Sequence, residues 1–389
     1  MSTVLIVGLA IAVLVCIVFT GVSVMAARQL VAAPAPKQLA FELHQSDAVR
    51  FPVTPQTVLP GEYGLIYDNG RGHARIGSVI DGGAEQGFVI RAFSSVTGTA
   101  IPRQGEGAFV RDVYRTPAAL GLPFENVDIV SDAGTSPAWV VTPGSGSYST
   151  VWAIHLHGIR TTRSVVLPGV LALSGLGITS LVVSWRGDTE GPQTANGTSF
   201  LGQEEWRDVE AAIAFVMSSG AESIIFIGWS MGATIARLLM ERSRFRDRVA
   251  GMVLISPVTS WRAVIKRAIR AARLPAAVAW GVEVALGNRV LSRFAGLSTP
   301  VSLGALESVS TNHTRPVPTL VIHNPGDDLV PFSTVAAYVA RNSKHTELVV
   351  FEESPHAMEW NVEPKKFEET LRTWASALLH DRSRQLGNE

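Results

Sequence analysis

The sequence feature that most constrains the fold lies after Ser149, where short apolar runs alternate with helical stretches. The apolar runs, which we expect to be strands, are Val151–His155, Thr179–Trp185, Ser223–Ile227, Val249–Ile255, Thr319–His323 and Glu347–Phe351. Between them, Gln203–Ser218 places apolar side chains three and four residues apart, as on one face of a helix. Such alternation is typical of a parallel sheet covered by helices on both faces. The sequence therefore predicts an α/β domain over residues 148–382.

The alternation stops between Pro257 and Pro316. Trp261–Arg273 has a helical pattern, and an apolar, Ala-rich stretch follows it. An insertion here would lie over the strand ends at which ligands bind in open α/β sheets, so we expect a helical cap at about residues 257–316. Its first helix is basic and amphipathic, which suits contact with anionic lipid or, as the alternative, a solvated lid surface. The basic residues are Arg262, Lys266, Arg267, Arg270 and Arg273.

The region before the α/β domain is expected to be rich in β-structure. Short apolar runs alternate there with Gly, Pro and Asn-Gly turns, and Gly64–Asp68 and Ala74–Ile80 flank Asn69-Gly70 as in a hairpin. The region has no recognisable set of catalytic residues. We expect an accessory β-rich domain over residues 41–147 that packs on, or screens, the α/β domain.

The N-terminus carries 24 uncharged residues from Val4 to Ala27. As a helix this run would be about 36 Å long, enough to cross a bilayer core of about 30 Å. We expect a membrane anchor at residues 1–30 and a proline-containing linker at residues 31–40, with Ala32–Pro36 extended. A cleavable signal peptide and a buried core helix are the alternatives. Arg28 and Lys37 lie after the run, which by itself would place the α/β domain on the cytoplasmic side.

The composition excludes two broad classes of protein. Apolar residues make up 47% of the chain and charged residues 17%, which argues against disorder. Lys+Arg and Asp+Glu are 33 each, so the chain lacks an overall basic charge and we expect no nucleic-acid partner. Cys16 is the single cysteine, so an intramolecular disulfide is excluded.

The segment Gly228–Gly232 (GWSMG) fits a nucleophile elbow, G-x-S-x-G. An apolar strand leads into it and a helical stretch leads out, and this context makes a short pattern specific. Glycines on both sides of Ser230 allow the tight turn, and the helix N-terminus presents N–H groups to a developing oxyanion. Ser230 is therefore the candidate nucleophile.

A serine hydroxyl is a weak nucleophile and needs a base that is oriented by an acid. Asp327 follows the predicted strand Thr319–His323 within NPGDDLVP, and Asp328 is the competing acid. His356 lies in the exit loop of the next strand, in the order serine, acid, histidine that accompanies such an elbow. It is therefore the candidate base. The rival histidines, which lie before, within or at the start of strands, are His313, His323 and His345.

The oxyanion hole needs two N–H donors, and the sequence offers one candidate for each. Met231 directly follows the nucleophile, and Ile159 lies in the HGI turn after Val151–His155. His155 and His157 form an H-x-H pair, but no carboxylate or cysteine cluster accompanies them, so we expect no metal and no other cofactor. The following arginines either bind an anionic substrate group or are solvated or salt-bridged. They are Arg160 and Arg163.

The segments HGIR, GWSMG, GDDLVP and SPHAMEW together resemble the α/β-hydrolase superfamily over about Ser149–Leu379. The resemblance is to its esterase and serine-aminopeptidase-like branches, which are themselves similar to prolyl-oligopeptidase-type domains. In this family the acid stands four residues before the proline of D-x-x-V-P, which implies Asp327. The family histidine usually follows a glycine or small residue, whereas Ser354 and Pro355 precede His356 here. The resemblance does not cover the β-rich region.

The resemblance implies a doubly wound, mostly parallel sheet and an acyl-enzyme mechanism with the triad Ser230, Asp327 and His356. We therefore expect a membrane-tethered serine hydrolase of small-molecule or lipid esters. A serine peptidase is the first alternative, because an elbow does not distinguish esters from amides. An acyltransferase and a non-catalytic binding protein on the same fold are the others. The substrate-binding residues stay unassigned.

Overall fold

The computed structural model describes residues 3–32, 37–83, 85–144, 149–308 and 316–386. Its larger part is an eight-stranded sheet in the order β14-β13-β12-β11-β9-β10-β8-β7. The first six strands of this order, β14 through β10, are parallel to one another. At the edge next to β10, β8 pairs antiparallel with β10, and β7 pairs antiparallel with β8. The strands are β7 (Phe124–Ser131), β8 (Gly134–Val141), β9 (Val151–Leu156), β10 (Thr179–Val183), β11 (Ser223–Trp229), β12 (Val249–Ile255), β13 (Thr319–His323) and β14 (Thr346–Val350). All six strands predicted from the apolar runs are present.

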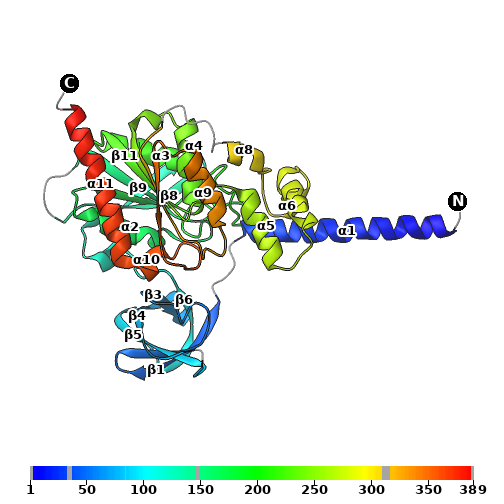
Figure 1. Cartoon of the computed structure of the whole chain (residues 1–389), viewed down its shortest axis with the longest axis horizontal. Helices are drawn as coiled ribbons and strands as arrows, with labels where there is room; N and C mark the ends of the chain where they lie inside the picture. The colour runs from blue at the N-terminus through cyan, green and yellow to red at the C-terminus, as the bar shows by residue number, and fades with distance from the viewer. Residues whose placement is uncertain (1–2, 33–36, 84, 145–148, 309–315, 387–389) are drawn as a thin grey trace.

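Helices cover both faces of this sheet (Figure 1). On one face lie α2 (Leu167–Ser174) and α11 (Pro364–Leu386), which pack with the apolar side chains of one core. On the other lie α3 (Trp206–Ser218), α4 (Met231–Arg242) and α9 (Phe332–Arg341), whose apolar faces join the second core. The predicted doubly wound α/β fold is therefore confirmed. The short helices are α10 (Glu359–Val362), η1 (Asp68–Gly70), η2 (Pro117–Leu120), η3 (Arg163–Val166) and η4 (Arg246–Arg248).

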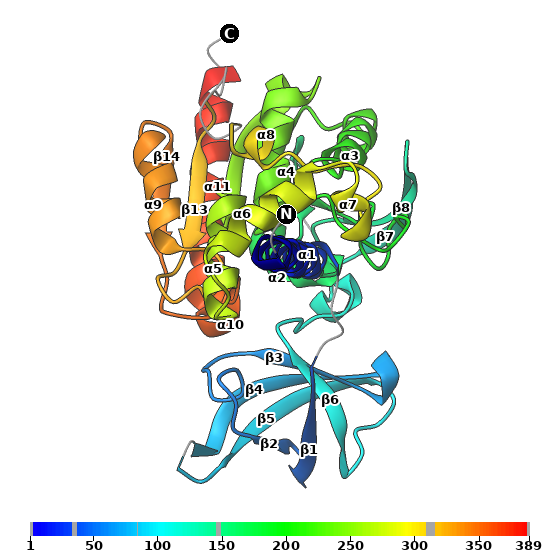
Figure 2. The ribbon, with the colours of Figure 1, turned by 90° about the vertical axis from the view of Figure 1, so that its right-hand side faces the viewer.

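The β-rich region is a closed six-stranded barrel in the order β1-β2-β5-β4-β3-β6 (Figure 2). Its strands are β1 (Gln38–Gln45), β2 (Ala48–Pro52), β3 (Tyr63–Tyr67), β4 (Gly72–Gly83), β5 (Phe88–Gly98) and β6 (Gln104–Val110). The predicted hairpin is β3–β4, which turns through Asn69 and Gly70 at positive φ. Pairing of β1 with β6 closes the barrel and removes the exposed sheet edge.

The expected boundary between the two β-containing regions differs from the structure. We placed residues 41–147 in one accessory domain, but β7 and β8 pair with the large sheet through β10. The barrel therefore ends at Val110, and the chain from Phe124 onward belongs to the α/β domain. The sequence pattern does not distinguish the two cases, because an antiparallel hairpin has the same alternation of apolar and polar residues in a barrel as at a sheet edge.

The cap lies between β12 and β13, as expected, and consists of four helices. These are α5 (Trp261–Ala271), α6 (Ala277–Gly287), α7 (Leu291–Phe294) and α8 (Leu303–Ser308). The basic residue Arg262 on α5 is paired with Glu283 and Glu307, so part of the basic face forms ion pairs within the cap. The last part of the predicted cap, residues 309–315, lies outside the described residues, and His313 lies there too.

The N-terminal helix α1 (Thr3–Val31) is long and apolar enough to cross a membrane. Its large apolar side chains from Leu5 to Val18 are exposed, between 49% and 62%. In the last third of the helix, within the expected anchor of residues 1–30 and just beyond it, Ser23, Ala27 and Val31 are buried: α1 packs there on α6 and α7 of the cap, and the Val31 carbonyl accepts the Ser199 N–H. These three residues share one helix face at a spacing of four. The predicted linker of residues 31–40 is shorter in the structure, because Val31 still belongs to α1 and residues 38–40 already belong to β1, and its residues 33–36 lie outside the described residues.

Candidate active site

Ser230 occupies the turn between β11 and α4, where its backbone has φ 54° and ψ −111°. This left-handed geometry is strained for a residue with a side chain. The flanking glycines are required sterically: a Cβ on Gly232 would lie 2.2 Å from the Leu156 carbonyl oxygen, and one on Gly228 would lie 2.8 Å from Ala233 N. The Ser230 N–H donates to the Ile255 carbonyl at 2.8 Å, which fixes the turn to β12.

The structure brings Ser230, His356 and Asp327 together in one hydrogen-bonded chain. His356 Nε2 lies 2.7 Å from Ser230 Oγ, and His356 Nδ1 lies 2.7 Å from Asp327 Oδ2. Ser230 and Asp327 are buried, whereas His356 keeps 13% of its side chain exposed. A base in contact with both the nucleophile and an orienting carboxylate is the arrangement that activates a serine.

Asp327 is held ionised by its surroundings. Burial by itself raises the pKa of this carboxyl, but His356 and several hydrogen bonds outweigh burial and hold its pKa below the ordinary 3.8. Its second oxygen, Oδ1, accepts the N–H groups of Leu329 and Val330 at 2.9 and 2.7 Å. The competing acid Asp328 accepts the backbone N–H of His356 at 3.0 Å instead. Of the two acids, Asp327 is therefore the one whose carboxylate contacts the imidazole.

A second buried carboxylate lies directly behind this chain of residues. Ser256 Oγ lies 2.9 Å from Asp327 Oδ2 and 2.6 Å from Glu359 Oε1. Glu359 Oε1 also accepts Asn324 Nδ2 at 2.9 Å. Sequence reasoning missed Ser256 and Glu359. The signal for Ser256 was its position directly after a strand, at the same sheet edge as Ser230 and Asp327.

The buried cluster around Asp327 has the residue types of a metal site, but its contacts do not favour metal binding. His323, Asp327 and Glu359 have ligand-type atoms within 4.8 Å of one another, and they are the only such group among the described residues. All three are buried, and Asp327 Oδ2 is already hydrogen-bonded to His356 and Ser256. We interpret the cluster as a hydrogen-bonded support for the acid.

The two segments that carry the expected oxyanion donors both adjoin Ser230. Met231 is the first residue of α4, and Gly158 packs so closely on Ser230 that a Cβ there would lie 3.3 Å from the serine Cβ. This places the turn that carries the Ile159 N–H beside the nucleophile. A carbonyl oxygen held between the turn and the helix N-terminus would meet N–H groups from both.

Two stretches of the chain match known protein families. Residues 139–370 match the Alpha/beta hydrolase family, and this stretch is more than half of the chain. The chain belongs to the alpha/beta hydrolase family. Residues 39–110, which are the barrel, match a separate family described as a domain of unknown function (DUF8805). No curated protein matches the chain.

Solved structures share the fold of this hydrolase. Two crystal forms of the Pyrococcus furiosus esterase Pf2001 have TM-scores of 0.53 and 0.52 and sequence identities of 21% and 20%. Each comparison covers 68% of this chain, and 94% or 96% of the esterase. At this identity the likeness establishes the fold. Together with the family match it identifies the chain as a hydrolase with an α/β-hydrolase sheet.

The H-x-H pair of the hydrolase does not converge on a common point. His155 Nε2 contacts Ser180 Oγ at 3.0 Å, and burial lowers the pKa of His155 to about 3. His157 Nε2 lies 3.0 Å from Asp188 Oδ2. His155 lies within β9, whereas His157 follows Leu156, the last residue of that strand, so the regular alternation of the strand does not align the two rings. Both histidines are therefore structural.

The two arginines after the HGI turn have different surroundings. Arg163 is buried, lies over the Trp139 ring at 3.9 Å and pairs with Glu190 at 3.4 Å. Arg160 is exposed and donates to the Gln29 carbonyl at 3.0 Å. Arg163 is therefore salt-bridged, which was one of the two predicted alternatives. Arg160 instead lines a cavity beside the site.

The barrel of the hydrolase is attached to the segment that follows His356. Asn361 Nδ2 donates to the carbonyls of Glu62 and Arg111 at 2.7 and 3.0 Å, and the Glu62 N–H donates to the Asn361 carbonyl at 2.9 Å. Arg111 Nη1 also reaches the His356 carbonyl at 3.3 Å. No local sequence pattern points to Arg111, because its contact with this segment depends on where the barrel docks.

Proposed function

We propose that this hydrolase cleaves carboxylic esters through an acyl-enzyme, with Ser230 as nucleophile, His356 as base and Asp327 as orienting acid. The observation that carries the proposal is the pair of 2.7 Å contacts from the two nitrogens of His356 to Ser230 Oγ and Asp327 Oδ2. The Pf2001 structures, which are described as esterases, support an ester as the substrate bond.

Each residue has a defined role in the proposed reaction. Ser230 Oγ attacks the ester carbonyl carbon while its proton passes to His356 Nε2. The N–H groups of Ile159 and Met231 stabilise the resulting oxyanion. The bond from carbon to the leaving oxygen then breaks, and His356 delivers the proton to the departing alcohol. A water molecule, deprotonated by His356, attacks the acyl-enzyme and releases the acid together with Ser230.

Labelling with a fluorophosphonate probe tests this proposal. The wild type is expected to be labelled, and S230A and H356A are expected to abolish labelling, because each removes a member of a unit that acts together. S218A is the matched control, since Ser218 lies at the end of α3 and its hydroxyl bonds only a nearby carbonyl. A folded wild type that is neither labelled nor active on p-nitrophenyl butyrate would contradict the proposal in favour of a binding protein.

We further propose that α1 is a retained membrane anchor. Signal-peptide cleavage after the apolar run would remove Ser23 and Ala27, which are buried against the cap. A Cβ on Gly281 of α6 would lie 2.1 Å from Ser23 Oγ, so the two helices approach as closely as a glycine allows. This close packing supports a helix that stays part of the mature protein.

The length of the exposed part of α1 supports contact between the cap and the bilayer surface. Residues 3–18 are 16 residues, or about 24 Å of helix, which is less than the bilayer core of about 30 Å. The next turn carries Phe19, which stacks on Trp280 of the cap at 6.4 Å between ring centroids. Trp280 is 65% exposed, and tryptophan favours the membrane interface.

A further inference from the structure

A cavity of about 790 Å³ lies between the barrel and the α/β domain. On the α/β side it is lined by residues adjacent in sequence to the proposed catalytic groups: Arg160 and Thr161 follow Ile159, Asp328 follows Asp327, and Pro355 precedes His356. On the barrel side Phe109, Val110 and Arg111 line it, and its other apolar residues include Leu39, Ile66, Trp139 and Met358. The cavity therefore borders the reaction site and combines apolar walls with charged groups.

The cations of this cavity are more available than its anions. Arg111, Arg115, Arg160 and Lys37 line it, and none of them forms an ion pair within the described part of the chain. Of its acids, Glu190 pairs with Arg163 and Asp328 accepts the His356 N–H, while burial raises the pKa of Asp112 and the charges of Arg111 and Arg115 lower it. Asp112, Glu359, Asp327 and Asp328 all act on the charge of Arg111, but in the described part of the chain none of them lies within ion-pair distance of its guanidinium. An incoming anion would therefore meet a guanidinium that has no direct ion-pair partner.

Arg111 contacts the backbone of the proposed base, His356, and its surroundings differ from those of a structural arginine. Arg91, which is buried in the barrel, donates to four carbonyls, those of Thr57, Leu59, Gly61 and Gly77. The Arg111 guanidinium is partly buried as well, and burial lowers its pKa, yet within the described part of the chain its side chain donates one hydrogen bond, to the His356 carbonyl at 3.3 Å. A guanidinium has five N–H donors, so most of those of Arg111 remain for a ligand.

We propose that this cavity binds an anionic group, a carboxylate or phosphate, on the acyl chain of the ester substrate, with Arg111 as its ion-pair partner. The inference rests on the proposed esterase function and adds the substrate class to it. The apolar walls would contact the chain between the ester carbonyl and the anion. In this arrangement the barrel supplies the recognition of substrate and the α/β domain supplies the reaction.

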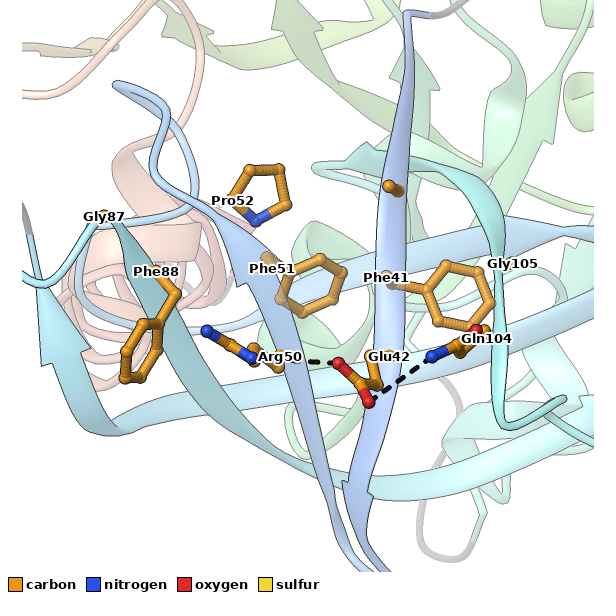
Figure 3. A pocket seen from close by; sticks show the side chains of 10 residues that line it. Phe41, Glu42, Arg50, Phe51, Pro52, Gly87, Phe88, Gln104 and Gly105 are labelled. Carbon is orange, nitrogen blue, oxygen red and sulfur yellow. Dashed lines mark hydrogen bonds and ion pairs between the residues drawn. The ribbon is translucent and has the colours of Figure 1, made fainter.

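A second cavity, lined by barrel residues, differs from the first in how its arginine is paired (Figure 3). It has a volume of about 380 Å³ and contains Arg50, which lies over the Phe88 ring and pairs with Glu42 at 3.8 Å. Its arginine already has a carboxylate partner, and none of its lining residues adjoins a proposed catalytic group. Arg50 therefore provides a matched control for Arg111 on the same barrel.

The test compares turnover of p-nitrophenyl hemiglutarate, p-nitrophenyl hexanoate and a phosphate-terminated p-nitrophenyl ester of similar length by the full-length protein. We expect kcat/KM of the wild type to be about tenfold higher for at least one charged ester than for the neutral one. R111Q should lower this ratio about tenfold, mainly through KM, and R111K should retain part of it. R50Q should leave the ratio unchanged. The charged ester that is preferred distinguishes a carboxylate from a phosphate.

Two results would overturn the inference: a wild type that favours the neutral ester over both charged esters, or a folded R111Q with an unchanged ratio. If R111Q fails to fold, salt provides the second measurement, because added salt should lower the ratio of the wild type and a salt-independent ratio contradicts an ion pair. Absence of both fluorophosphonate labelling and turnover would instead overturn the proposed function. Labelling together with hydrolysis of the neutral ester only would leave that function standing and refute the anionic substrate.

Discussion

The barrel and helix α1 are both additions to the same α/β domain, but they are attached in different ways. The barrel is held by directed hydrogen bonds to Asn361, five residues after His356, and Met358 packs in the barrel's own core. Helix α1 packs against the cap through the close approach of Ser23 to Gly281, and only its last residues accept hydrogen bonds from the α/β domain, at the carbonyls of Gln29 and Val31. The barrel thus contacts the segment that carries the proposed base, whereas most of the length of α1 lies away from that segment. The barrel is therefore placed to affect the reaction, and α1 to affect where the enzyme sits.

The largest effect on activity should come from a substitution within the α/β domain itself, and the effects of the barrel and of α1 are compared with it. D327N should lower kcat for p-nitrophenyl butyrate by roughly 10³–10⁴-fold, because an amide does not hold the imidazole in the required tautomer. D381N, an exposed position on α11, should have no effect. A loss below tenfold in folded D327N would show that another group, such as Asp328, orients the base.

D327N should also change how the free energy of unfolding depends on pH. The folded pKa of Asp327 lies below its ordinary value of 3.8, so its ionisation stabilises the fold above that pH, and this contribution is lost as the pH falls through the folded pKa. The difference in unfolding free energy between wild type and D327N should therefore shrink on acidification below about pH 4. Denaturant titrations from pH 7 to pH 3 measure it, and a difference that grows in acid would be inconsistent with an ionised Asp327.

The proposed reaction groups were predictable from sequence to the extent that local backbone geometry requires particular residues. The Ser230 turn excludes side chains at Gly228 and Gly232, so the elbow is visible as a motif. The parallel strands were visible because burial on both faces makes them continuously apolar. Arg111 meets the cavity only through the docking of the barrel, and no local pattern encodes docking. The same limit explains why β7 and β8 were assigned to the wrong region.

The barrel attachment should have the next largest effect, and Gly61 probes it. Gly61 has φ 92°, and a Cβ there would lie 1.8 Å from the Asn361 carbonyl oxygen. Gly70 also has a positive φ, 84°, but its Cβ would meet nothing within 4 Å. G61A and G70A therefore share the backbone strain, and only G61A displaces the barrel from the segment after His356. We expect kcat/KM to fall about tenfold further in G61A than in G70A.

Equal activities of G61A and G70A, measured at matched folded fractions, would show that the barrel does not influence the reaction. The barrel and α1 would then not differ in their influence on the reaction. Fluorophosphonate labelling rates provide an independent readout, since they report the reactivity of Ser230 without requiring that a particular substrate fit the cavity.

Helix α1 should affect activity least, and two truncations separate its two parts. Deleting residues 2–18 removes exposed side chains, so turnover of a soluble ester should stay within about twofold while the protein leaves the membrane fraction. Deleting residues 2–31 also removes the buried residues Ser23, Ala27 and Val31 and should lower Tm by several degrees. Intact mass of the membrane-extracted full-length protein should match the complete chain. A mature protein that begins after Ala27, or a shorter truncation that stays with the membrane, would refute the retained anchor. In either case α1 would no longer fix the enzyme's position, and only the attachment of the barrel would keep a role.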